Sequence, residues 1–148
     1  MTEAVLRLMA PKDYPALFAL WNSVPGFNRG LRSLDDSEAG IQKFLKRNPT
    51  TCFVAEIAGA IIGGILAGHD GRRGYIYHAV VLPEHQGKGI GKQLVNAACE
   101  ALIAEGINRA AMLVFAGNQQ GNAFWESQGW QTRPDLVYRN KNLNEENR

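Results

Sequence analysis

The sequence has little of what marks disulfide-bonded, metal-binding or nucleic-acid-binding proteins. Its 148 residues include only two cysteines, Cys52 and Cys99, which lie far apart and form no C-x-x-C pair. We therefore expect buried thiols, one in a strand and one in a helix, with no disulfide and no metal. The 16 basic and 14 acidic residues leave a net charge of +2, without the clustered basic excess typical of nucleic-acid binding.

Long apolar runs are also lacking. The longest, at 58–68, is interrupted by four glycines and is much shorter than the ~20 residues of a membrane span. Residues 1–7 have neither a long apolar core nor a small-residue cleavage site, so we expect no signal peptide. These absences predict a cytoplasmic protein that has neither a membrane nor a nucleic acid as a partner.

The residues that are present suit one α/β domain, expected at 1–140, with a polar tail at 141–148. A chain of this length can bury its own core, and 45% hydrophobic with 20% charged residues argues against disorder. Apolar spacing and Gly/Pro signals predict the element order β-α-α-β-β-β-α-β-α-β. The expected strands are 5–9, 52–57, 61–67, 75–82, 110–115 and one or two edge strands within 130–139. The expected helices begin near Pro11 and at Ser37, after Gly91 and near Asn122.

The glycine-rich segment 80–92 carries the strongest chemical signal. A strand enters it, three glycines follow at alternate positions, and a long amphipathic helix leaves it. Glycines let the backbone approach a ligand closely, and the start of a helix offers unpaired N–H groups and partial positive charge to a phosphate. Lys88 and Lys92 would add positive charge. The alternative is a turn that serves only tight packing of the strand against the helix.

Two other phosphate-binding motifs do not fit this segment. The nucleoside triphosphate loop needs a glycine where Gln86 stands and a Ser or Thr where Gln93 stands. The dinucleotide fingerprint needs a third glycine at position 92, which is a lysine, and it belongs to the first β-α unit of a parallel sheet. A nucleotide-binding module is therefore the weaker alternative.

Two motifs together resemble a known family. Gln86-x-x-Gly89-x-Gly91, preceded by Val81-x-Pro83, is similar to the acyl-CoA signature of the Gcn5-related N-acetyltransferases (GNAT). Asn118 followed by the segment 123–130 (AFWESQGW) resembles the family's second motif, and the order of elements also matches. The resemblance implies a single α/β domain with a mixed, mostly antiparallel sheet flanked by helices, whose central strands splay apart.

The resemblance also implies acetyl-CoA as cosubstrate and a set of binding residues. Backbone groups on the strand before the loop would meet the pantetheine and the acetyl carbonyl, and loop amides would hold the pyrophosphate. Asn118 would hydrogen-bond the pantetheine side, although a turn or a helix cap is an alternative for this residue. The expected binding residues are Ala79, Val80, Val81, Gln86, Gly87, Lys88, Gly89, Ile90, Gly91, Lys92 and Asn118.

The implied reaction is transfer of an acetyl group to a primary amine by direct attack in a ternary complex. The acceptor would be a small molecule or a protein amine, and exposed edge strands would allow a homodimer. The strand 75–79 has no carboxylate, and Leu113 stands where some relatives carry a glutamate. A non-catalytic acyl-CoA-binding or regulatory domain is therefore the alternative.

Four residues are the catalytic candidates: Tyr75, Tyr77, His78 and Trp125. Strict strand alternation places the two tyrosines on one face and His78 on the other. Family bases on this strand favour the tyrosine face, whereas an imidazole is the better base, and a bulge would re-aim either set. A hydrogen-bonded structural histidine is the alternative for His78. Trp125 stands where relatives carry an acidic tyrosine, and its indole could donate a hydrogen bond, pack on the pantetheine or fill the core.

The segment 27–36 is the first candidate for acceptor recognition because it is the most polar stretch of the first half, and the hairpin at 69–73 is the second candidate. It carries Phe27, Asn28, Arg29, Arg32, Asp35 and Asp36. Either aspartate could hold a cationic amine. Asp35-Asp36-Ser37 is also an ordinary start for the second helix, and that interpretation is favoured.

Overall fold

A five-stranded sheet forms the centre of the computed structural model, which describes residues 3–148. The strands lie side by side in chain order, each antiparallel to its neighbour except β4 and β5, which are parallel. This arrangement confirms the mixed, mostly antiparallel sheet implied by the resemblance. The strands are β1 (Val5–Leu8), β2 (Phe53–Ile57), β3 (Ala60–His69), β4 (Gly74–Val81) and β5 (Ala110–Met112).

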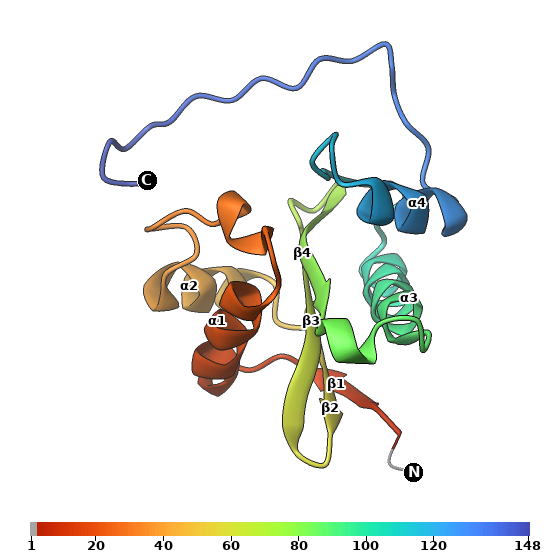
Figure 1. The fold of residues 1–148 in the computed structure, drawn as a ribbon. Helices are drawn as coiled ribbons and strands as arrows, with labels where there is room; N and C mark the ends of the chain where they lie inside the picture. Colours follow the sequence, from red (N-terminus) through yellow and green to blue (C-terminus); the bar gives the residue numbers. More distant parts are fainter. Residues whose placement is uncertain (1–2) are drawn as a thin grey trace.

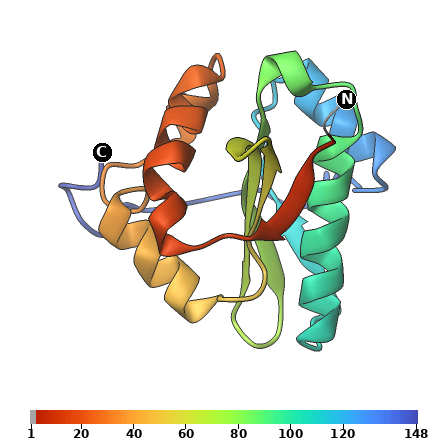
Figure 2. The same cartoon turned by 90° about the horizontal axis from the view of Figure 1, so that it is seen from below.

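The α-helices cover both faces of the sheet (Figures 1 and 2). Helices α1 (Tyr14–Ser23) and α2 (Glu38–Arg47) lie on one face, and α3 (Ile90–Ala104) and α4 (Gln119–Ser127) lie on the other. Each face has its own buried cluster, since Leu17 and Trp21 of α1 pack with one set of strand residues and Leu94 of α3 packs with the other. Three short 3-10 turns, η1 (Pro11–Asp13), η2 (Phe27–Gly30) and η3 (Pro83–His85), connect these elements.

Local signals in the sequence explain several boundaries. Ser37 caps α2, because its hydroxyl accepts a hydrogen bond from the N–H of Gly40 at 3.1 Å. The hairpin between β3 and β4 is held by Asp70, whose carboxylate accepts from the N–H groups of Arg72 and Arg73, both at 2.8 Å. Gly106 follows the end of α3 with a φ of 79°.

The largest differences from the predicted elements lie in the last third of the chain. β5 ends at Met112 instead of residue 115, because it pairs only with Gly74–Ile76 of β4. α4 begins at Gln119, three residues early, because Asn118 caps it. Residues 131–148 contain no edge strand. They run as an extended segment past the top of the domain in Figure 1, where Pro134 also lacks the N–H that a ladder needs.

The end of this segment contacts the loop between α1 and α2. The N–H of Ser33 donates to the carbonyl of Arg148 at 2.7 Å, and the amide oxygen of Asn147 accepts from the N–H groups of Leu34 and Asp35 at 3.0 and 3.2 Å. Residues more than 110 positions apart in the chain are therefore neighbours here.

The two cysteines are free. Cys52 is buried directly before β2, and Cys99 is half-buried in α3. Within residues 3–148, no helix is both long and apolar enough to cross a membrane. Over the same residues, His, Cys, Asp and Glu side chains form no group of three that could hold a metal ion.

Candidate active site

The second half of β4 has an open edge. β5 pairs with β4 only as far as Ile76, so the two strands separate from Tyr77 onward, as the resemblance implies. Leu82 turns its N–H toward the carbonyl of Ile62, on the β3 side, whereas the carbonyl of Val81 points the other way. Because backbone groups alternate along a strand, Ala79 and Val81 both direct their N–H and C=O groups toward the open edge.

The glycine loop follows this edge directly. Gly87 and Gly89 have φ values of 78° and 83°, which L side chains rarely adopt. A Cβ added at either position would meet no atom within 4 Å, so the space beyond the loop is open. Gly91 differs, because a Cβ there would lie 3.3 Å from the ring of Phe124. Gly91 therefore allows α4 to pack closely on α3.

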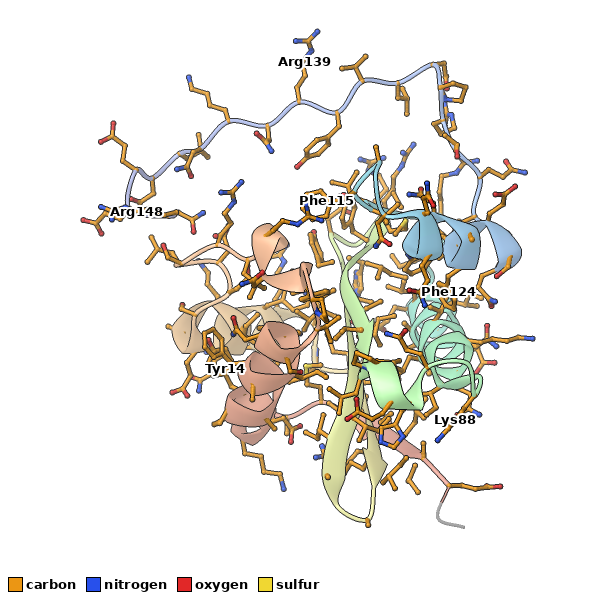
Figure 3. The ribbon with its side chains drawn as sticks, in the orientation of Figure 1. Tyr14, Lys88, Phe115, Phe124, Arg139 and Arg148 are labelled. Atoms are coloured by element: carbon orange, nitrogen blue, oxygen red, sulfur yellow. The ribbon has the colours of Figure 1, made fainter. Side chains whose placement is uncertain are left out.

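The first turn of α3 presents free backbone donors. Gly89 is its N-cap without a side-chain cap, and the first intrahelical bond runs from the N–H of Gln93 to the carbonyl of Gly89 at 3.0 Å. The amides of Ile90, Gly91 and Lys92 therefore have no intrahelical partner and carry partial positive charge. Lys88 extends from the exposed loop beside them (Figure 3). This geometry suits an anionic group.

Gln86 holds the loop against the rest of the domain. Its Nε2 donates to the carbonyl of Val81 at 2.9 Å, and its Oε1 accepts from Nε2 of Gln120 in α4 at 3.1 Å. The side chain therefore ties the end of β4 to α4. Asn118 acts as the cap that was its alternative, since its Oδ1 accepts from the N–H of Gly121 at 2.9 Å.

A β-bulge at Tyr77 breaks the alternation of β4. Leu66 on β3 is opposite His78 and Ala67 is opposite Ile76, so Tyr77 is the extra residue. The bulge that the sequence analysis left open is therefore present, and strict alternation does not hold along β4.

The bulge places three of the catalytic candidates on the face that carries α1 and α2. Tyr75 and Tyr77 have ring centroids 4.6 Å apart, and Tyr77 contacts Phe44 of α2 edge-on at 5.4 Å. The ring of His78 contacts Trp21 of α1 edge-on at 5.1 Å and Phe27 of η2 at 5.5 Å. The tyrosine face and the histidine face of the prediction are one face.

The two tyrosines are protonated at neutral pH. Burial raises the pKa of Tyr75 to about 12, with smaller contributions from Tyr138 and Tyr77. Burial and then the charge of Asp70 also raise the pKa of Tyr77. Neutral phenols donate hydrogen bonds but do not accept a proton, so among these three residues only His78 suits the role of a base.

His78 pairs with a residue whose role the sequence did not reveal. Its Nε2 lies 2.6 Å from Oδ1 of Asp36, and both side chains are largely buried. Asp36 was expected at the start of α2 or as a ligand for an amine, but Ser37 is the cap. The two residues are 42 positions apart, and no local pattern joins them.

The other residues considered in the sequence analysis lie in other parts of the domain. Trp125 is only 8% exposed and packs against Phe124 and Trp130 at 5.3 and 5.2 Å, in the core beneath α4. Leu113 lies just beyond the end of β5 and is exposed. Nδ1 of His85, next to the glycine loop, is buried and has no hydrogen-bond partner among the described residues.

A hollow opens on the α1 side, next to Asp36. Its lining includes Tyr14, Asn28, Arg32, Asp36 and Glu38, which combine polar and charged groups. The guanidinium of Arg29 lies 4.7 Å from the ring centroid of Phe115, and this contact joins η2 to the loop after β5. The hollow contains part of the segment predicted for acceptor recognition.

Comparison with known proteins gives a consistent result. A family model described as the acetyltransferase (GNAT) family matches residues 14–130. An acetyltransferase of Sodalis glossinidius is 28% identical over 141 residues, 95% of this chain and 96% of that protein. An acetyltransferase of Pectobacterium atrosepticum is 30% identical over 127 residues, 86% of this chain and 87% of that protein.

A solved structure has the same fold. Aminoglycoside N-acetyltransferase AAC(6')-Iy, in complex with CoA, superposes with a TM-score of 0.74, 18% identity, and coverage of 95% of this chain and 96% of that one. At this identity the likeness concerns the fold. The family match over most of the chain and the named relatives confirm the prediction of an acetyltransferase. The chain belongs to the acetyltransferase (GNAT) family.

Proposed function

We propose that this protein transfers an acetyl group from acetyl-CoA to a primary amine, by direct attack in a ternary complex. The observation that carries the proposal is the continuous path from the open edge of β4 to the glycine loop and the free amides of α3. A thioester with a long amide-containing arm and a pyrophosphate needs these two features in this order. AAC(6')-Iy, which shares the fold, was crystallised with CoA.

The contacts expected with acetyl-CoA are distributed along this path. Ala79 and Val81 have backbone groups at the open edge that would pair with the pantetheine amides, and Val80 holds the strand in place from the buried side. The N–H groups of residues 87–92 would hold the pyrophosphate, with Lys88 and Lys92 adding charge. Gln86 and Asn118 would act mainly by holding the loop and the start of α4 in position.

The chemistry needs a neutral amine and a stabilised oxyanion. Backbone N–H groups at the open edge of β4 would stabilise the charge that develops on the acyl carbonyl oxygen. His78 would accept the proton that the amine loses as the C–N bond forms and the C–S bond breaks. Tyr75 and Tyr77 would donate hydrogen bonds, and Trp125 would support the site through packing.

A non-catalytic acyl-CoA-binding domain is the second candidate. It is favoured by the burial of Trp125, where relatives carry a tyrosine acid, and by the absence of a carboxylate within β4. A thiol with a pKa near ~8.5 leaves without full protonation, so the missing acid does not prevent transfer.

Calorimetry with acetyl-CoA, CoA, ATP and NAD at one salt concentration tests donor binding. We expect tight binding of the two CoA species alone, and binding of ATP or NAD in their place would contradict the proposal. Thiol release with a panel of small amines and peptide amines then separates the two candidates. Acetyl-CoA binding without thiol release from any amine would favour the non-catalytic domain.

A further inference from the structure

The structure contains a histidine–carboxylate pair that no sequence motif indicates. We infer that Asp36, on the loop before α2, is a positioning residue that holds His78 as a base toward the amine acceptor. This inference rests on the proposed function, because it assigns a second residue to the same transfer reaction.

The geometry fixes which ring nitrogen is available. Nε2 of His78 lies 2.6 Å from Oδ1 of Asp36, and a carboxylate accepts a hydrogen bond, so this nitrogen carries the proton. Nδ1 has no hydrogen-bond partner within residues 3–148 and is not completely buried. Its lone pair is therefore not engaged by any donor of the described residues.

Asp36 is itself held on each side. Its Oδ2 accepts from the N–H of Arg32 at 2.7 Å, and its carbonyl accepts from the hydroxyl of Tyr14 at 2.8 Å. The residue is 8% exposed. A carboxylate that is buried and hydrogen-bonded in this way has little freedom to turn away from His78.

Two aromatic side chains also restrict the ring of His78. Trp21 and Phe27 contact it edge-on, and the bulge at Tyr77 points it toward α1 and η2 instead of toward α3. These contacts fix the ring plane, so the hydrogen bond to Asp36 sets the tautomer and not the position alone.

Within residues 3–148, Asp36 is the one charged side chain that forms an ion pair or hydrogen bond with His78. Among the neighbouring ionisable groups, Tyr14 of α1 donates to the Asp36 carbonyl, Arg29 of η2 stacks on Phe115, and Tyr77 of β4 contacts Phe44. Arg32 contributes its backbone N–H. Asp36 is therefore the one carboxylate that pairs with His78 among the described residues.

These two residues account for the proton that the amine loses. Nδ1 of His78 takes a proton from the attacking amine while the C–N bond forms, and the carboxylate of Asp36 stabilises the imidazolium through the Nε2–H that it retains. When the C–S bond breaks, the electron pair leaves on sulfur. The proton on Nδ1 then passes to that thiolate or to water.

The test compares Asp36→Asn, Asp36→Glu and His78→Gln with wild type, after checking that each has wild-type circular dichroism. Asp135→Asn removes an exposed carboxylate that pairs with Arg133 in the C-terminal segment and is the matched control for activity. The first readout needs no substrate. Histidine ring ¹⁵N shifts, with the His78 signal identified by its loss in His78→Gln, report its tautomer across the pH range.

We expect the Nε2–H tautomer in wild type and its loss in Asp36→Asn. Asp35→Asn, one residue earlier and exposed, should leave the His78 shifts unchanged. The second readout is kcat and KM, measured separately, with an amine acceptor. In Asp36→Asn kcat should fall by roughly 10- to 100-fold, because the ring nitrogen that takes the proton is no longer held in its basic form.

Acetyl-CoA affinity should stay within about twofold of wild type, Asp36→Glu should recover part of the rate, and Asp135→Asn should behave as wild type. An Nδ1–H tautomer in wild type would overturn the inference. So would an Asp36→Asn variant whose rate falls while its His78 shifts stay in place, because that pattern indicates a structural role alone.

The outcome also separates this inference from the proposed function. Wild type that binds acetyl-CoA but acetylates no amine would refute the transfer reaction, and the role of Asp36 in it. Wild type that acetylates an amine, combined with unchanged His78 ring shifts in Asp36→Asn, would refute only the role of Asp36.

Discussion

At the scale of single residues, position 89 requires glycine for two reasons, the backbone conformation and the space that the proposed ligand needs. Its φ of 83° favours glycine, and the space where a side chain would project is open. Gly89→Val should therefore lose acetyl-CoA binding by at least about tenfold, because the side chain enters the expected phosphate path. Isothermal titration calorimetry measures this loss.

Gly59 provides the matched control. It has a φ of 81° and equally open surroundings, but it lies in the turn between β2 and β3. Gly59→Val should lower the unfolding temperature about as much as Gly89→Val and leave acetyl-CoA binding intact. Equal affinity in both variants would contradict the role of the loop.

A second residue-scale prediction concerns Asp13 and acid stability. Its carboxylate accepts two hydrogen bonds from Arg7, at 2.8 and 2.9 Å, and one from the N–H of Ala10 at 2.7 Å. Burial acts to raise the pKa of Asp13, but these hydrogen bonds outweigh it and the pKa is lower than usual. The unfolded state therefore binds the proton more readily, at about pH 3.9.

The stability that Asp13 contributes should be complete above about pH 4 and decline as the pH falls from there through its lowered folded-state pKa. Asp13→Asn should cost about 1–3 kcal/mol of unfolding free energy at pH 7 and flatten this acid decline. Urea denaturation from pH 2.5 to 7 measures both effects. If the unfolding free energy of Asp13→Asn changed with pH in parallel to that of wild type, the role assigned to Asp13 would be wrong. Asp135→Asn, which removes an exposed carboxylate, is the control.

At the scale of elements, the packing of α4 decides what Trp125 does. The indole is buried with Phe124 and Trp130, and Phe124 itself packs over Gly91 of α3. Trp125→Tyr should therefore cost about 1–2 kcal/mol of stability through lost packing volume, with little change in acetyl-CoA affinity. Thermal unfolding and calorimetry test this. A stable variant with a markedly raised turnover would show instead that position 125 faces the leaving sulfur.

At the scale of the whole molecule, the C-terminal segment connects to the loop that carries Asp36. Asn147 and Arg148 hydrogen-bond to Ser33, Leu34 and Asp35, directly before Asp36. Deleting residues 141–148 should raise amide hydrogen exchange at 33–35 by about tenfold or more, because each lost bond contributes stability there. Exchange in α3 should not change. Unaltered protection at 33–35 would show that the contact contributes nothing.

Prediction from the sequence succeeded where the signals are local. The helices, the hairpin at Asp70 and the glycine loop follow from spacing, capping and turn chemistry, which act within a few residues. Prediction was wrong for the strands within 130–139, and it left the face of His78 open between strict alternation and a bulge. Strand pairing depends on which edge is available, and β5 pairs with β4 over only three residues.

By itself, the sequence determined the α/β class, the position of the glycine loop and the family, because motif spacing and periodicity are properties of the sequence alone. The tertiary structure alone decided the partners. A bulge of one residue at Tyr77 turned His78 toward α1, and the loop before α2 brought Asp36 against it across 42 positions of the chain. Side-chain periodicity cannot register a bulge, and contacts between distant segments depend on how the whole domain packs.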